Sequence, residues 1–266
     1  MLSDTQTNWL AGGVLAALGL WLLVWIVTRV RRTRYTPAQI PFFYPYNLVM
    51  ARVLWRAEVV GRLAVGPNDG AVIVCNHIGP IDPAFISLAS DRIVHWMVAR
   101  EYCSHPAMAW FFRIMQAIPV NRGGVDTAST KLAIRYAQHG GLVGLFLEGR
   151  INSTDKLLLP GRPGAALIAV KARVPVIPCF LRGSPYDGTS FGCLFMAARA
   201  RLIIGQPIDI SSYYGREGDK GVLEELTKRF LVEIARLAGV ENYPAEVAGR
   251  NWKTGAEPVT VGENGR

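Results

Sequence analysis

His77 and Asp82 are the two residues whose types and spacing best fit acid–base chemistry. Between them lie Gly79 and Pro80, so a folded-back turn can bring the Asp82 carboxylate to one imidazole nitrogen and leave the other nitrogen facing a cleft. A carboxylate in that position fixes the tautomer of the histidine, makes the ring more basic and stabilises the imidazolium that forms. Such a pair takes a proton from a hydroxyl or a thiol.

The hydroxyl can belong to a substrate, because the chain offers no obvious nucleophile of its own. No Gly-x-Ser-x-Gly sequence occurs, and no serine or cysteine near His77 lies in a nucleophile motif. The alternative is that Asp82 only caps a helix and that His77 is an ordinary turn residue. This stretch alone does not decide between the two interpretations.

A strand and a helix are expected to position the pair. Ala71–Cys75 is short, apolar and uncharged, and the turn sequence 67–70 precedes it, which predicts a buried strand. Asp82 and Pro83 together form a helix-start signal. His77 therefore follows the end of a strand just before a helix begins.

Similar segments alternate along the rest of the chain. Strands are predicted at 59–65, 71–75, 93–98, 117–120, 142–147, 175–181 and 201–204. Helices are predicted at 83–89, 106–115, 127–138, 163–171 and 221–237. This alternation predicts an α/β domain with a largely parallel sheet flanked by helices. Binding residues are then expected at the carboxyl ends of the strands, where His77, Arg122 and Glu148 fall.

Four segments resemble, in the same order, the motif blocks of the glycerolipid acyltransferase family, whose best-known members are the lysophosphatidic acid acyltransferases. Residues 76–82 read Asn-His-Ile-Gly-Pro-Ile-Asp and resemble the Asn-His-x4-Asp block. Residues 118–123 resemble the second block, 145–150 the third block, Phe-Pro-Glu-Gly-Thr-Arg, and 174–178 the fourth. Together the matches cover roughly residues 57–182.

The resemblance implies a glycerol-3-phosphate acyltransferase-like fold and an O-acyltransferase of phospholipid biosynthesis. The enzyme would move a fatty acyl group from a thioester, acyl-CoA or acyl-ACP, to the hydroxyl of lysophosphatidic acid and so make phosphatidic acid. The thioester is a co-substrate, and no further cofactor is expected, since the chain has no Walker loop and no Gly-x-Gly-x-x-Gly. No histidine has metal-ligand spacing, so no metal site is expected either.

The resemblance also implies roles for individual residues. His77 would be the general base and Asp82 would orient it, with direct attack by the acceptor hydroxyl and no acyl-enzyme. The residues expected to bind substrate are Asn76, Arg122, Glu148, Gly149 and Arg150. Among them Arg122 is expected to hold the acceptor phosphate, since a guanidinium binds phosphate with two parallel hydrogen bonds.

The third block departs from the family's pattern. Leu147 replaces the usual proline, Arg150 stands where threonine is typical, and Ile151 stands where the family has arginine. The role of Arg150 is therefore open, and Lys156 and Arg162 are alternative cations. The departure also leaves open another lysolipid or an acylated amino acid as acceptor. A third alternative is a non-catalytic, membrane-anchored lipid-binding protein.

The N-terminus is expected to be a membrane anchor. Trp9–Thr28 carries no charge over 20 residues, long enough as a helix to span a bilayer core of roughly 30 Å. The alternative is a buried helix of a soluble protein. Arginines follow this segment at 29, 31, 32 and 34. By the positive-inside rule, the protein is expected to be a single-pass membrane protein with its catalytic domain on the cytoplasmic side.

Charge and composition complete the expected organisation. The net charge of +9 favours an anionic membrane surface as partner, and no motif supports binding to nucleic acid. The predicted division is an anchor at 1–34, an interfacial linker with a short helix at 35–56, the acyltransferase domain at 57–240 and a polar tail at 241–266.

Overall fold

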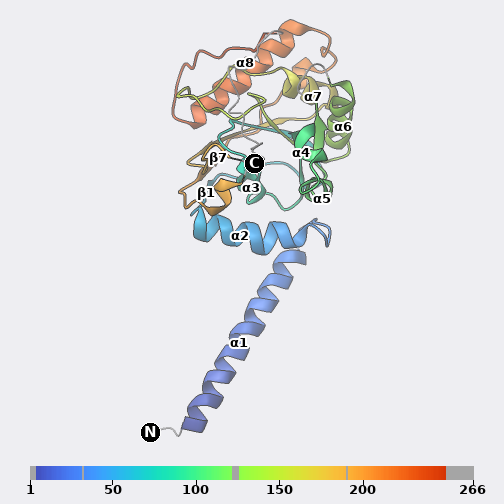
Figure 1. Cartoon of the computed structure of the whole chain (residues 1–266). Coiled ribbons are helices and arrows are strands. Elements are labelled where there is room, and N and C mark those ends of the chain that lie inside the picture. Colours follow the sequence, from blue (N-terminus) through green and yellow to red (C-terminus); the bar gives the residue numbers. More distant parts are fainter. Residues whose placement is uncertain (1–3, 32, 122–125, 190, 250–266) are drawn as a thin grey trace, which may run out of the picture.

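The computed structural model describes residues 4–31, 33–121, 126–189 and 191–249 (Figure 1). Its centre is a seven-stranded sheet in the order β1-β7-β6-β2-β5-β3-β4. The strands are β1 (Glu58–Val60), β2 (Ala71–Cys75), β3 (Val94–Ala99), β4 (Ile118–Val120), β5 (Leu142–Phe146), β6 (Val176–Arg182) and β7 (Arg201–Ile204). Every neighbouring pair is parallel except β6 and β7. The predicted α/β fold with a largely parallel sheet is confirmed.

Helices surround this sheet, as predicted. They are α3 (Asp82–Ser87), α4 (Arg100–Ser104), α5 (Ala109–Ile114), α6 (Thr127–Gln138), α7 (Gly164–Ala172) and α8 (Lys220–Leu237), with 3-10 turns at Gly192–Phe195 and Ser211–Tyr213. The bounds of α6, β2 and β7 agree with the prediction. The first predicted strand, 59–65, is shorter in the structure, and α4 was not predicted.

Strand β2 lies at the centre of two hydrophobic cores, one on each face of the sheet. Val72 and Val74 join a cluster with α6, α7 and α8. Ile73 and Cys75 point to the opposite face and join a cluster that includes Trp55 and Phe85 of α3. Alternate residues of a strand point to opposite faces, so an uninterrupted apolar run is buried on both sides. The end of β2, and with it His77, is therefore held rigidly.

The N-terminal helix α1 (Asp4–Arg31) extends away from the rest of the molecule (Figure 1). Large apolar side chains along it are exposed, for example Leu15 and Trp21. Within the described residues, however, no helix is both long and apolar enough to cross a membrane. The predicted membrane span at Trp9–Thr28 is therefore not supported.

The segment after α1 is more helical than predicted. The interfacial linker at 35–56 was expected to hold one short helix, and the structure adds a π-helical turn at Phe42–Tyr46. It continues into α2 (Asn47–Val49) and a second π-helical turn, Met50–Leu54. Wider turns accommodate residues that disturb the regular α-helical hydrogen bonds, and Pro45 lacks a backbone donor.

The start of the predicted polar tail packs on the domain. The Gly161 N–H donates to Glu246 O, and the Ala248 N–H donates to Gly161 O. The Tyr243 hydroxyl donates to Leu158 O. This part of the chain is thus tied to the loop that follows Glu148, while residues 250–266 lie outside the described part.

Candidate active site

The turn after β2 brings His77 and Asp82 into contact, as predicted. Nδ1 of His77 lies 2.9 Å from Oδ2 of Asp82. The histidine side chain is 15% exposed, whereas the Asp82 side chain is fully buried. A buried carboxylate on Nδ1 fixes the tautomer in which Nδ1 carries the proton, and it leaves Nε2 available to accept one.

Asp82 does not cap its own helix. It is the first residue of α3, and its side chain turns back toward the strand. Oδ2 also accepts the N–H groups of Ile78 at 2.7 Å and Gly79 at 2.9 Å. The alternative in which Asp82 is only a helix cap is therefore wrong. The carboxylate closes the turn and orients the imidazole in one arrangement.

Aromatic stacking fixes the plane of the imidazole. The ring of Phe146 lies parallel to the ring of His77, with centroids 3.8 Å apart, and Trp96 stacks on Phe146 in turn. Gly144 makes room for this stack, since a Cβ there would lie 2.7 Å from the Trp96 ring. The sequence did not predict a role for Phe146. Phe146 ends β5 and pairs with Cys75 at the end of β2, and this position next to His77 is what could have indicated its role.

Glu148 connects the turn to a second loop. Oε1 accepts the His77 N–H and Oε2 accepts the Leu159 N–H, each at 3.0 Å. The side chain is fully buried, and this burial raises the pKa of Glu148 to about 7, although both hydrogen bonds favour the charged form. Glu148 was predicted to bind substrate. In the structure Oε1 holds the backbone of His77 and Oε2 holds the backbone of Leu159.

Asn76 ties β2 to β6. Its Nδ2 donates to the carbonyl of Leu181, and its Oδ1 accepts the N–H of the same residue, both at 2.8 Å. Asn76 is buried, at 4% exposure. It was also predicted to bind substrate, and the structure gives its side chain a positioning contact instead.

Gly149 and Arg150 form the turn that follows Glu148. Gly149 has a φ of 69°, and a Cβ there would lie 3.0 Å from Cδ of Arg162. The positive charge of Arg150 opposes the rise in the pKa of Glu148. Both arginines therefore lie close to this turn, and a role for either in binding substrate stays a prediction.

Arg122 lies outside the described residues, so its predicted phosphate contact stays a prediction. Asp126 accepts the N–H groups of Asn121 at 2.9 Å and of Ser129 at 3.0 Å, and these bonds lower the pKa of Asp126 to about 2. Asn121 directly follows β4 at the same edge of the sheet as His77.

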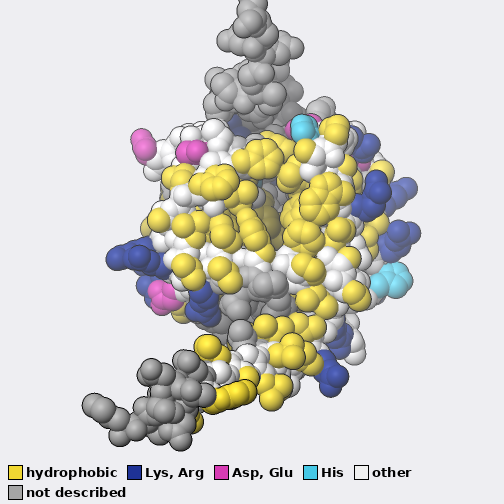
Figure 2. Space-filling view, turned by 60° about the horizontal axis from the view of Figure 1, so that its bottom comes forward, with side chains coloured by type: hydrophobic (Ala, Val, Ile, Leu, Met, Phe, Trp, Pro, Cys, Tyr) yellow, Lys and Arg dark blue, Asp and Glu magenta, His cyan; other side chains and the backbone are white. Residues whose placement is uncertain are grey.

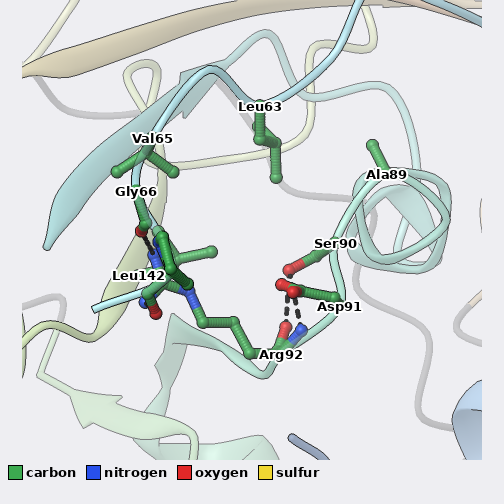
Figure 3. A pocket seen from close by; sticks show the side chains of 9 residues that line it. Leu63, Val65, Gly66, Ala89, Ser90, Asp91, Arg92 and Leu142 are labelled. Atoms are coloured by element: carbon green, nitrogen blue, oxygen red, sulfur yellow. Dashed lines mark hydrogen bonds between the residues drawn. The ribbon is translucent and has the colours of Figure 1, made fainter. Parts of the chain in front are cut away.

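A cavity of about 260 Å³ lies at the amino ends of β2, β3 and β5, whereas His77 follows the carboxyl end of β2 (Figure 3). Arg92 and Asp91 line it, together with apolar side chains that include Leu63 and Val65. The Arg92 guanidinium donates to four backbone carbonyls around the cavity. It is consequently committed to holding loops together, and the cavity is separate from the His77 site.

Comparison with known proteins agrees with this geometry. A family model described as Acyltransferase matches residues 56–182. A 1-acyl-sn-glycerol-3-phosphate acyltransferase of Bacillus subtilis (strain 168) is 29% identical over 177 residues, which cover 65% of this chain and 85% of that protein. A protein of the same name from Limnanthes douglasii is 24% identical over 116 residues, 43% of this chain and 41% of that protein.

The same fold occurs in a solved structure. The 1-acyl-sn-glycerophosphate (LPA) acyltransferase PlsC from Thermotoga maritima superimposes with a TM-score of 0.56 at 20% identity, over 84% of this chain and 91% of that chain.

Proposed function

Because the chain belongs to the acyltransferase family, we propose that it transfers a fatty acyl group from a thioester to the hydroxyl of lysophosphatidic acid and so forms phosphatidic acid. The chain is an acyltransferase of the lysophosphatidic acid acyltransferase type. The observation that carries the proposal is the 2.9 Å contact between His77 Nδ1 and the buried Asp82 carboxylate. This contact makes Nε2 a base for a substrate hydroxyl.

The reaction needs only one base. Nε2 of His77 takes the proton of the acceptor hydroxyl as its oxygen attacks the thioester carbonyl. The tetrahedral intermediate collapses, the carbon–sulfur bond breaks, and the thiolate leaves. The imidazolium then gives its proton to the sulfur, so that an ester and a free thiol are formed. Asp82 stabilises the imidazolium between these two steps.

We assign acceptor binding to Arg122. A phosphomonoester carries up to two negative charges, and a guanidinium matches its oxygens in a planar, two-bonded contact. Asn121, the residue before Arg122 in the sequence, follows β4, and His77 follows β2, at the carboxyl ends of parallel strands. An acceptor held by its phosphate at this edge would present its hydroxyl to His77. The thioester donor is acyl-CoA or acyl-ACP.

The proposal also places the reaction at a membrane surface, because acceptor and product are lipids. The supporting observation is a broad apolar face with Lys and Arg around its margin (Figure 2). Exposed apolar residues near α2, α5 and the 3-10 turn at Gly192–Phe195 are Tyr46, Val49, Val53, Trp110 and Phe195. Contacts between Phe42 and Trp110, and between Ala198 and Leu54, join these segments. Patches of this kind in soluble domains mark interaction sites.

Attachment is attributed to this face together with α1, with the catalytic domain on the cytoplasmic side. If α1 holds the protein on membranes, a chain without residues 4–31 is released from them at high salt. The full chain should stay bound under the same conditions. If the shortened chain also stays bound, the attachment belongs to the apolar face.

The first experiment follows free-thiol release from acyl-CoA by membranes that contain the protein, together with the mass of the lipid product. Release should depend on lysophosphatidic acid and on His77, and it should yield a diacyl product. Acyl-ACP is tested in parallel as donor. If thiol is released without a new lipid, the protein hydrolyses thioesters and the proposal fails.

The altered third block keeps a second acceptor class open. Acceptors that lack a phosphomonoester, such as lysolipids with a head group or an acylated amino acid, are therefore included. Turnover of these acceptors at the rate seen with lysophosphatidic acid would replace the proposed substrate and leave the acyl transfer chemistry in place.

A further inference from the structure

Ser184 reaches the active site from outside the segment that matches the acyltransferase family. The match ends at residue 182, at the end of β6. Gly183 follows with a φ of 70°, a conformation that turns the chain back over the sheet edge. A Cβ at Gly183 would lie 2.3 Å from the carbonyl oxygen of Arg199, so this turn is specific for glycine. It directs Ser184 inward, where the serine is 8% exposed.

The Ser184 hydroxyl donates a hydrogen bond to Oδ1 of Asp82 at 2.6 Å. The other oxygen, Oδ2, is already shared by His77 and two backbone N–H groups. Among the described residues, Ser184 is the hydrogen-bond partner of Oδ1. A hydroxyl bonded to a buried carboxylate is a strong, charge-assisted contact.

The neighbours of Ser184 hold it in this position. A Cβ built on Gly79 would lie 3.0 Å from the carbonyl oxygen of Pro185, 3.4 Å from Cβ of Tyr186 and 3.5 Å from the Ser184 hydroxyl. The segment Ser184–Tyr186 thus packs directly against the turn that joins His77 to Asp82. Ser184 and the backbone N–H groups of the turn approach the carboxylate from different segments.

The chemical consequence concerns rotation of the carboxylate. The terminal torsion of an aspartate is broad, so hydrogen bonds rather than rotamer preference must fix the carboxylate plane. The two oxygens rotate together about the Cβ–Cγ bond, so the Ser184 hydroxyl on Oδ1 adds a fourth restraint on that rotation to the three contacts of Oδ2. Without the Ser184 hydroxyl, Oδ1 is buried without a partner, and the carboxylate that supports the imidazole is held less firmly.

We propose that Ser184 is a positioning residue for acyl transfer, which acts through Asp82 to hold His77 in its reactive orientation. The inference rests on the proposed role of His77 as the base. It adds a third side chain to the pair, supplied from a distant part of the sequence. Ser184 does not touch the reacting atoms.

The test is Ser184→Ala in the full chain, with Ser87→Ala as matched control. Ser87 is also buried, lies on the same helix as Asp82, and donates to a backbone carbonyl instead of the carboxylate. Ser184→Ala should lower kcat about tenfold to a hundredfold, with the KM of both substrates within twofold of wild type. Ser87→Ala should leave kcat within twofold. A kcat for Ser184→Ala within threefold of wild type would overturn the proposal.

A double-mutant cycle separates positioning from general support of the fold. If Ser184 acts through Asp82, then Ser184→Ala should change the residual rate of Asp82→Asn by less than threefold. An equal loss in both backgrounds would refute the role. If Ser184→Ala does not fold, Ser184→Thr is measured instead. Threonine keeps the hydroxyl, so kcat should stay within about fivefold of wild type. A larger loss in folded Ser184→Thr would also count against the proposal.

His77→Ala separates this inference from the proposed function. Full turnover in His77→Ala would end the mechanism as a whole. Loss of turnover in His77→Ala together with normal turnover in Ser184→Ala would end only the role of Ser184.

Discussion

The two ends of the central strands bury charges of opposite sign. At the carboxyl end of β2, the Asp82 carboxylate accepts backbone N–H groups from the turn after the strand. At the amino ends, Arg92 donates to the carbonyls of Gly66, Pro67, Asp69 and Gly140, in the loops before β2 and β5. In both places the main chain compensates a buried charge.

The difference between the two ends lies in what remains to react. Arg92 is 8% exposed, and its hydrogen bonds all join loops of the chain (Figure 3). Asp82 instead contacts Nδ1 of His77, whose ring is partly exposed and has a second nitrogen. A buried charge therefore becomes functional when one of its partners is a titratable side chain that reaches the surface. When the partners are all carbonyls, the charge is structural.

Loss of the His77 side chain should have the largest effect on turnover. His77→Ala removes the base, and we expect kcat to fall by about a hundredfold to ten-thousandfold while the fold is kept. The matched control is His95→Gln. His95 is also stacked on an aromatic ring, that of Tyr136 at 3.9 Å, but its Nδ1 contacts a carbonyl, Gln116 O, and burial lowers its pKa. Steady-state rates of both variants measure the loss of turnover, and circular dichroism shows whether each variant is folded. Comparable losses of turnover would remove the distinction between the two histidines.

Arg122→Ala should have the next largest effect, on acceptor binding. The substitution removes a charge-assisted contact with two hydrogen bonds to the acceptor phosphate. The KM for lysophosphatidic acid should therefore rise about tenfold or more, and the KM for the thioester should stay nearly unchanged. Initial rates with each substrate varied in turn provide the measurement. If both KM values rise equally, the predicted phosphate contact is wrong.

Glu148 should make stability depend on pH at the catalytic end. Its pKa is about 7 in the folded protein, compared with 4.5 for the free side chain. Since the pKa is raised, the folded state keeps a proton that the unfolded state has lost, and stability is lost as pH rises from about 4.5 to 7. Relative to Glu148→Gln, the wild type should lose about 2 kcal/mol of unfolding free energy between pH 5 and pH 8.

Urea unfolding at the two pH values tests this expectation. The comparison with Glu148→Gln cancels the contributions of groups that are common to both proteins. A difference that stays constant between pH 5 and pH 8 would show that burial does not raise the pKa of Glu148.

Arg92→Met should have the smallest effect on turnover and a clear effect on stability. The change leaves buried carbonyls without their donor, which should cost about 2 to 4 kcal/mol of unfolding free energy. Arg92 lies at the amino ends of the strands and His77 at the carboxyl ends. The kcat of the folded enzyme should therefore stay within twofold of wild type. A large loss of kcat at full folding would mean that the two ends are coupled.

The pairing of His77 with Asp82 could be predicted because it is local. Only four residues separate His77 from Asp82, and two of them are Gly79 and Pro80, which favour a turn. Few backbone paths fit that spacing. The strand before them and the helix after them could be predicted from apolar runs and a helix-start signal for the same reason. The family resemblance added the blocks around Arg122 and Glu148, although Arg122 itself lies outside the described residues.

Other expectations depended on more than local pattern. Asn76 and Glu148 were identified from the blocks that contain them, yet the structure shows their side chains bonded to the backbone of other segments. The expected membrane span at Trp9–Thr28 rested on apolar content and length alone, and it found no support in the described helices. The composition of a segment does not determine which other segments surround it in the folded chain.

The sequence by itself determined the alternation of strands and helices, the parallel character of the sheet and the His77–Asp82 pair. The tertiary structure alone decided which distant groups complete that pair: the Ser184 hydroxyl, the Glu148 carboxylate and the Phe146 ring. The physical reason is the strand order, in which β6 and β5 flank β2. This order brings the ends of three strands that are far apart in the sequence to one place, and spacing along the chain does not reveal it.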